Sequence, residues 1–136
     1  MSGDTVIGLP LQFTNDNKRA YANSGLIDIQ NTSATYLLLD TNSEYIVGHF
    51  QCYNGSNTSE QIQWDISFND ILIIRFNQEG RGSAYRGQGI DNDIIIPPFT
   101  QVKVTGTNTG ASSAVNGLCV FAGKVGMAQR VGNLND

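Results

Sequence analysis

The chain has 136 residues, of which 40% are hydrophobic and only 15% are charged, and its formal net charge is −4. This length is that of one ordinary domain with its own core, and an acidic chain without a basic run is not typical of nucleic-acid-binding proteins. No apolar stretch approaches the roughly 20 residues of a membrane-spanning helix, and the first residues lack the regions of a secretory signal, so we expect synthesis in a cytoplasm and no membrane partner.

The N-terminal residues 1–23 show little alternation of apolar and polar side chains, which predicts an extended arm. From residue 24 to residue 125, short apolar runs are separated by Gly, Asn, Ser and Pro, which predicts one β-sandwich domain. Residues 126–136 are then a C-terminal tail. The expected strands cover residues 25–30, 35–39, 45–53, 61–68, 71–77, 93–96, 101–107 and 117–125.

About eight strands without a sustained helical period predict an all-β fold. We expect a single jelly-roll-like antiparallel β-sandwich, with an immunoglobulin-like sandwich or a small barrel as the alternatives. The lone adjacent pair Pro97 and Pro98 favours the jelly roll, because prolines cannot continue a central ladder and therefore mark a corner between two sheets.

The two cysteines and the single histidine are poor candidates for catalysis or metal binding. Cys52 and Cys119 lie in expected strands, and buried small side chains are favoured over a disulfide. His49 alternates to the opposite side of its strand from Cys52, so the two do not share a metal site.

The clearest hairpin joins residues 61–68 to residues 71–77 through Asn69 and Asp70, a typical turn pair. Trp64 alternates with Ile62 and Ile66 along the first of these strands, which places it in the core. The segment 78–89 is rich in glycine and is expected to be a long loop. No helix follows its glycines, which argues against a phosphate-binding loop.

The acidic pair Asp91 and Asp93 is better explained by a turn than by a calcium site or by the two carboxylates of a glycosidase. The sequence also shows no nucleophile elbow that would join His49 in a Ser-His-Asp triad. We therefore expect no catalytic residue, no metal ligand and no cofactor, and not an enzyme.

Two kinds of binding function remain open. The first is assembly, for which a surface with few charges is suited because burying unpaired ions is costly. The second is an adhesion or carbohydrate-binding module. Its candidate ligand or partner loop is formed by Tyr53, Arg81, Tyr85 and Arg86.

Three segments, 13–25 (FTNDNKRAYANSG), 45–50 (YIVGHF) and 95–104 (IIPPFTQVKV), resemble small jelly-roll virion proteins of tailed bacteriophages, particularly those of aquatic environments. The resemblance implies a capsid decoration or cement protein, or part of a head fibre, and often a homotrimer. Its partners would be further copies of itself and the major capsid protein or another virion protein, with a surface glycan as a further option.

Such a protein would lie on the outer capsid surface, where an acidic chain is kept away from packaged DNA. The arm and the tail are then expected to extend each interface across neighbouring subunits, since each buried apolar side chain contributes about 1.5–3 kcal/mol. The expected assembly contacts are Ile7, Leu9, Leu11, Phe13, Val125, Met127, Val131 and Leu134.

Overall fold

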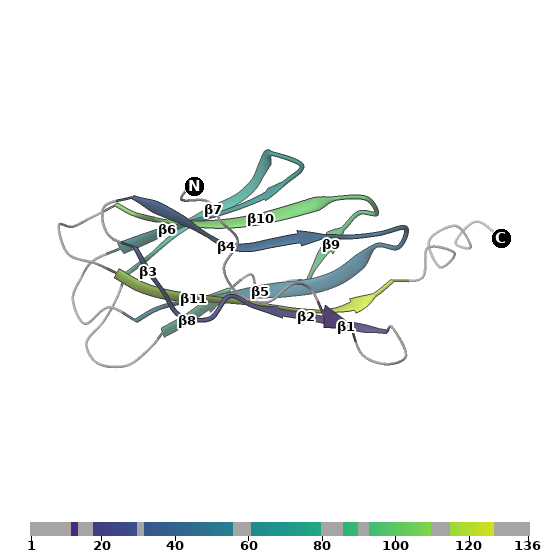
Figure 1. Ribbon diagram of the computed structural model, residues 1–136, viewed down its shortest axis with the longest axis horizontal. Helices are drawn as coiled ribbons and strands as arrows, with labels where there is room; N and C mark the ends of the chain where they lie inside the picture. The colour runs from purple at the N-terminus through teal and green to yellow at the C-terminus, as the bar shows by residue number, and fades with distance from the viewer. Residues whose placement is uncertain are drawn as a thin grey trace.

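The computed structural model describes residues 12–13, 18–29, 32–55, 61–79, 86–89, 93–109 and 115–126. These residues form two antiparallel sheets that pack face to face, and the strands of both run along the long axis of the molecule (Figure 1). The all-β, jelly-roll-like sandwich expected from the sequence is confirmed.

The larger sheet has seven strands. Its main order is β1 (Gln12–Phe13), β2 (Arg19–Asn23), β11 (Val115–Val125), β5 (Ile46–Asn54) and β8 (Arg86–Gly89). In addition, β3 (Ile27–Ile29) pairs with the first part of β11, and β9 (Ile94–Ile96) pairs with the first part of β5. The long strands β11 and β5 therefore form the centre of this sheet.

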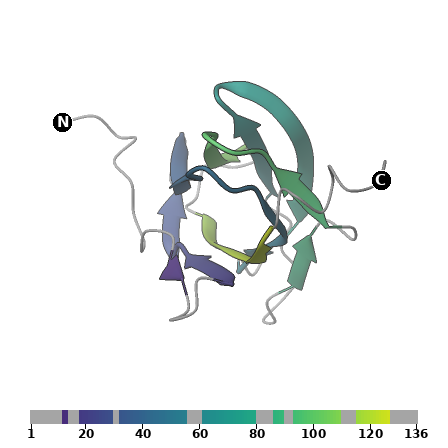
Figure 2. The ribbon, with the colours of Figure 1, turned by 90° about the vertical axis from the view of Figure 1, so that its right-hand side faces the viewer.

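The smaller sheet has four strands. Their order is β4 (Ser33–Asp40), β10 (Gln101–Asn108), β6 (Gln61–Phe68) and β7 (Ile71–Glu79). The β6–β7 hairpin projects at the top of Figure 1 and of Figure 2. Its turn residues Asn69 and Asp70 have φ angles of 50° and 69°, as the tight turn of a two-residue hairpin requires.

The eight expected strands correspond to β3 to β7 and β9 to β11. The expected corner at Pro97 and Pro98 is confirmed, because β9 belongs to the larger sheet and β10 to the smaller one. Thr41 fastens this corner. Its hydroxyl donates to Pro97 O over 2.7 Å and accepts from the Thr100 amide over 2.9 Å.

Three strands of the larger sheet, β1, β2 and β8, and the end of β7 in the smaller sheet lie where the sequence predicted no strand. Strand β2 lies inside the range 1–23 expected as an extended arm, and it pairs with β11 while burying Ala20 and Ala22. Alanine alternating with polar residues carries little apolar signal, so this strand depends on its partner for detection. The prediction of a loop over residues 78–89 is wrong at both ends, because β7 continues to Glu79 and residues 86–89 form β8, which pairs with β5.

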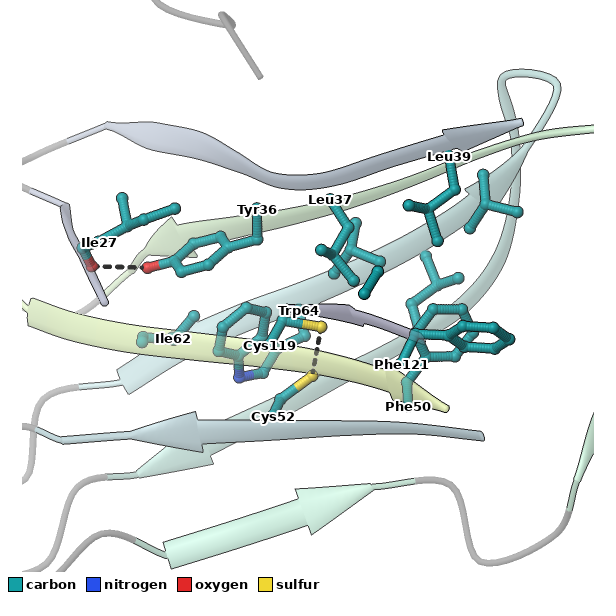
Figure 3. Packing of buried hydrophobic residues seen from close by; sticks show 14 of the residues in the cluster. Ile27, Tyr36, Leu37, Leu39, Phe50, Cys52, Ile62, Trp64, Cys119 and Phe121 are labelled. Carbon is teal, nitrogen blue, oxygen red and sulfur yellow. Dashed lines mark hydrogen bonds between the residues drawn. The ribbon is translucent and has the colours of Figure 1, made fainter. Parts of the chain in front are cut away.

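Aromatic side chains from both sheets fill the core (Figure 3). Trp64 is fully buried, as expected, and its ring centroid lies 4.8 Å from that of Tyr36 in an edge-on arrangement. Phe50 and Phe121 face each other across β5 and β11, with centroids 4.8 Å apart. The Tyr36 hydroxyl donates to Ile27 O over 3.0 Å, so the phenol reaches the larger sheet with its polar atom satisfied.

Cys52 and Cys119 are direct cross-strand partners, and their sulfur atoms lie 3.7 Å apart in the core (Figure 3). Both thiols are free and buried, which confirms the prediction that they are buried small side chains. Burial raises the pKa of the Cys119 thiol well above its ordinary value, and the hydrogen bond with Cys52 acts in the same direction.

Candidate functional site

Most of the expected contact residues lie outside the described part of the chain: Ile7, Leu9, Leu11, Met127, Val131, Leu134, Arg81 and Tyr85. Phe13 ends β1, and Val125 ends β11 with its side chain half-buried. Arg86 begins β8 opposite Asn54 of β5. Tyr53 lies on the outer face of β5, where its hydroxyl donates to Gln51 Oε1 over 3.0 Å.

Within the described ranges, no group of three or more His, Cys, Asp or Glu side chains is placed to hold a metal ion. The same ranges contain no helix long and apolar enough to cross a membrane. Two other surface features stand out. One is a set of exposed apolar side chains, and the other is a hollow on the outer face of the larger sheet.

Three successive exposed apolar side chains lie on β7, the last strand of the smaller sheet among the described strands. Ile71, Leu72 and Ile73 are 66%, 48% and 47% exposed. The register shifts here, since Ile66 pairs with Ile74 while the next residue of β6 pairs with Leu72, so Ile73 is the extra residue of a β-bulge. The bulge breaks the alternation, which is why three successive apolar side chains reach solvent.

Phe99, which is 74% exposed, lies at the same end of the molecule. Two hydrogen bonds join the β6–β7 turn to the residues that follow Phe99: the Asn69 amide donates to Gln101 O over 2.8 Å, and the Gln101 amide donates to Asn69 Oδ1 over 2.8 Å. We call Ile71, Leu72, Ile73 and Phe99 together the apolar end.

The edge of β7 has little free charge. Arg75 donates two hydrogen bonds to the carboxylate of Asp65 on β6, over 2.7 and 3.0 Å. These hydrogen bonds, together with the attraction between the charges, raise the pKa of the Arg75 guanidinium. Charged side chains usually protect a sheet edge from pairing with another edge. Because the charge of Arg75 is neutralised by Asp65, the edge of β7 remains open to a partner.

The second feature is a hollow of about 490 Å³ on the outer face of the larger sheet, which we call the groove. It is lined by Arg19, Ala20 and Tyr21 of β2, Val47, Gly48 and His49 of β5, Ala122, Gly123 and Lys124 of β11, and Asp93 just before β9.

Strand register explains the hollow. Tyr21 and His49 are the partners of Ala122 on either side, so a methyl group lies between two large rings. In the next row Arg19 is the direct partner of Lys124, which places two cations side by side. A small residue between large neighbours is what makes this part of the face concave.

Two glycines support the floor of the groove. Gly48 and Gly123 are cross-strand partners. A Cβ on Gly48 would overlap the backbone oxygen of Ala122 and lie 2.8 Å from the Phe121 ring, and one on Gly123 would lie 2.8 Å from Val47 O. The strands therefore approach too closely here for any side chain to be inserted.

At the far side of the groove, His49 Nδ1 lies 3.7 Å from Asp93 Oδ1. Both side chains are accessible, with 47% and 65% of their surfaces exposed. From the sequence, neither His49 nor Asp93 was expected to belong to a site, and no pattern linked the two. The groove was missed because its residues are spread from position 19 to position 124, and only the register brings them together.

No protein-family model matches the chain, and no curated protein matches it either. Among solved structures, the chain is similar to an insecticidal delta-endotoxin of Bacillus thuringiensis, with a TM-score of 0.52 and 9% sequence identity. That similarity covers 74% of this chain and 20% of the toxin.

A chain in the structure of infectious bursal disease virus, Gx strain, is also similar, with a TM-score of 0.41 and 12% identity. The match covers 74% of this chain and 33% of the viral chain. The protein thus spans about a fifth and a third of the two chains. At this identity the toxin similarity concerns the β-sandwich fold alone.

Proposed function

We propose that this protein is a structural, non-enzymatic subunit that works by non-covalent assembly with further copies of itself. In its more specific form, the proposal is a virion protein on the outer capsid surface of a tailed bacteriophage, acting as a decoration or cement protein. The observation on which the assembly proposal rests is the apolar end on the edge of the smaller sheet.

An exposed apolar edge is costly to leave in water. Buried apolar surface contributes about 25 cal/mol per Å², and an edge strand also offers unpaired backbone groups to a partner strand. In the described part of β7 the hairpin end contributes three such side chains, and the one nearby arginine is already paired with Asp65. A second copy of the same edge would cover both the side chains and the backbone.

The virion role is supported by the resemblance of segments 13–25, 45–50 and 95–104 to phage virion proteins. A low charged fraction of 15% also suits burial between subunits. Within this proposal the arm and the tail add contacts to neighbouring subunits, including the capsid protein. Removing residues 1–11 should then weaken assembly while the unfolding transition of the sandwich persists.

The test is the native mass of the full-length chain at micromolar concentration, measured by native mass spectrometry and light scattering. We expect a closed oligomer for the natural chain. The triple variant Ile71→Thr, Leu72→Thr, Ile73→Thr should be monomeric, because it removes the exposed apolar atoms while keeping side chains that favour strands.

Leu26→Thr is the matched control, since Leu26 is 57% exposed but precedes β3, away from the β6–β7 turn. It should leave the mass of the oligomer unchanged. A monomeric natural chain, or a triple variant with unchanged mass, would contradict assembly through the apolar end. The virion location needs its own test, in which antibodies against the chain label intact virions in immunogold electron microscopy.

A further inference from the structure

Cys52 and Cys119 are the only two cysteines of the chain, and the register makes them direct partners on the two central strands of the larger sheet. Among the described strands, Cys52 has one other cross-strand partner, Gln88 of β8. Both cysteines are fully buried in the core, and their sulfur atoms face each other there (Figure 3). We propose that this pair is a disulfide site, which closes when the chain folds in the presence of a disulfide oxidant and then links β5 covalently to β11.

The backbone hydrogen bonds show which kind of cross-strand pair this is. The Cys119 amide donates to Ser24 Oγ over 2.9 Å, and Cys119 O accepts from the Ser24 amide over 2.9 Å. In an antiparallel sheet both backbone groups of a residue point to the same side, so Cys119 directs neither of them toward β5. The Gly55 amide donates to Asn116 O over 2.7 Å in the same register, and the alternation of pair types from there leads to the same result. Cys52 and Cys119 are therefore a non-hydrogen-bonded pair.

A pair of this kind suits a disulfide. Its Cα atoms are about 4.5 Å apart, which lies inside the range of about 4.4–6.8 Å that disulfides span. Its side chains also stand closer together than those of a hydrogen-bonded pair. The sulfur atoms are 3.7 Å apart as thiols, and an approach of roughly 1.7 Å by rotation about the Cα–Cβ bonds brings them to bonding distance. The two strands can thus keep their register when the bond forms.

The bond would join parts of the sequence that are far apart. The segment between the two cysteines contains β6, β7 and β10, which are three of the four strands of the smaller sheet. A disulfide stabilises a fold mainly by restricting the unfolded chain, and the effect grows with the length of the closed loop. Here the loop covers residues 52–119, which is half of the chain, so the oxidised form should be clearly more stable than the reduced one.

The reaction is a thiol–disulfide exchange with a low-molecular-weight disulfide such as oxidised glutathione. One cysteine thiolate attacks a sulfur of the oxidant, forms a mixed disulfide and releases one glutathione as its thiol. The second cysteine thiolate then attacks the cysteine sulfur of the mixed disulfide and releases the other glutathione. The two cysteines lose two electrons and two protons, and these end on the two molecules of reduced glutathione.

Burial decides when this exchange takes place. Both cysteines are fully buried in the folded chain, where an oxidant of this size does not reach them. The reactive thiolate is also disfavoured there, because burial raises the pKa of the Cys119 thiol. The bond therefore forms while the chain folds, or when β5 and β11 separate. Once the sandwich has closed, the same burial protects the bond from reducing agents.

The test is to refold the full-length chain from guanidinium in a mixture of reduced and oxidised glutathione, alkylate the free thiols and measure the intact mass. We expect a single chain that is lighter by two hydrogen atoms and carries no alkyl group. The equilibrium constant for forming the bond should be about 100-fold greater in the folded protein than in the same chain kept in guanidinium. The oxidised form should correspondingly melt roughly 10 °C above the reduced form.

Two controls separate the bond from other effects of the oxidant. The first is the natural chain refolded with dithiothreitol, which has the same sequence and both thiols free. The second is the double variant Cys52→Ala, Cys119→Ala, whose melting temperature should be the same with and without oxidised glutathione. Heteronuclear NMR spectra of each form report whether the sandwich is intact.

Three results would overturn the proposal. The first is a folded chain that keeps both thiols free in excess oxidised glutathione. The second is oxidation that links cysteines only to glutathione or to another chain. The third is an oxidised form that melts at or below the temperature of the reduced form. Because all three concern the interior of one chain, they are independent of whether the apolar end forms an oligomer.

Discussion

Gln78 joins the two sheets, and its replacement gives the sharpest test of the core. Trp64 Nε1 on β6 donates to Gln78 Oε1 over 3.0 Å, and Gln78 Nε2 donates to Cys52 O on β5 over 3.0 Å. The Gln78 side chain thus links a donor of the smaller sheet to an acceptor of the larger one. Asn54 Nδ2 of β5 donates to the backbone carbonyl of Gln78 over 2.9 Å and would keep its bond in a side-chain variant.

The variant Gln78→Met keeps the length of the side chain but removes its hydrogen-bonding groups. It leaves the Trp64 indole N–H and the Cys52 carbonyl, both in fully buried residues, without this partner. The buried indole N–H left unsatisfied costs about 1–3 kcal/mol and the loss of one hydrogen bond to the Cys52 carbonyl about 0.5–1.5 kcal/mol, so the free energy of unfolding should fall by about 2–4 kcal/mol. For a chain of this size the melting temperature should fall by roughly 3 °C per kcal/mol.

Urea unfolding followed by fluorescence measures this loss directly, because Trp64 is the single tryptophan of the chain. Far-UV circular dichroism should report the same transition. Gln63→Met is the matched control. Gln63 lies on the outer face of β6 opposite Asn77, and its change should stay within about 0.5 kcal/mol. A loss below about 1 kcal/mol for Gln78→Met would refute the argument that these hydrogen bonds tie the sheets together.

Four further predictions concern the core. Burial raises the pKa of Tyr36, so the folded protein keeps this phenol protonated at a pH where the unfolded chain ionises it. The free energy of unfolding should therefore fall as the pH rises above 10. In urea titrations at alkaline pH, Tyr36→Phe should make this dependence on pH less steep. Tyr36→Phe should also cost about 1 kcal/mol at neutral pH, since it removes one buried hydrogen bond. Gly48→Ala should lower stability by about 1–3 kcal/mol or more in thermal melts, because its Cβ would overlap the backbone of Ala122; a neutral effect would contradict the close approach of the strands. Cys52 and Cys119 should react with a thiol reagent only after unfolding in guanidinium, and rapid reaction of the native protein would show that the core opens.

Local patterns were enough to predict the regular strands. In β6 the alternation of Ile62, Trp64 and Ile66 with polar residues is a period of two, and a sheet with one buried face requires that period. The turn at Asn69 and Asp70 was also local, because few residues adopt positive φ angles easily.

Weak local patterns explain why β2 and β8 were not predicted. In β2 the buried positions are occupied by Ala20 and Ala22, whose small side chains give little apolar contrast. In β8 two of the four residues are glycine, which is disfavoured in isolated strands. Both strands form by pairing with a long neighbour, β11 or β5, that supplies the ladder of hydrogen bonds.

The all-β sandwich, the tight hairpin, the proline corner and the place of Trp64 in the core could be predicted, because each of these features depends on residues close together in the chain. Which strands pair, and in which register, depends on contacts between segments far apart in the chain and became known from the fold. That register placed Cys52 beside Cys119 and set Arg19 next to Lys124 at the groove. Pairing between distant strands depends on the packing of the whole domain, and a shift of one residue would turn every side chain to the opposite face.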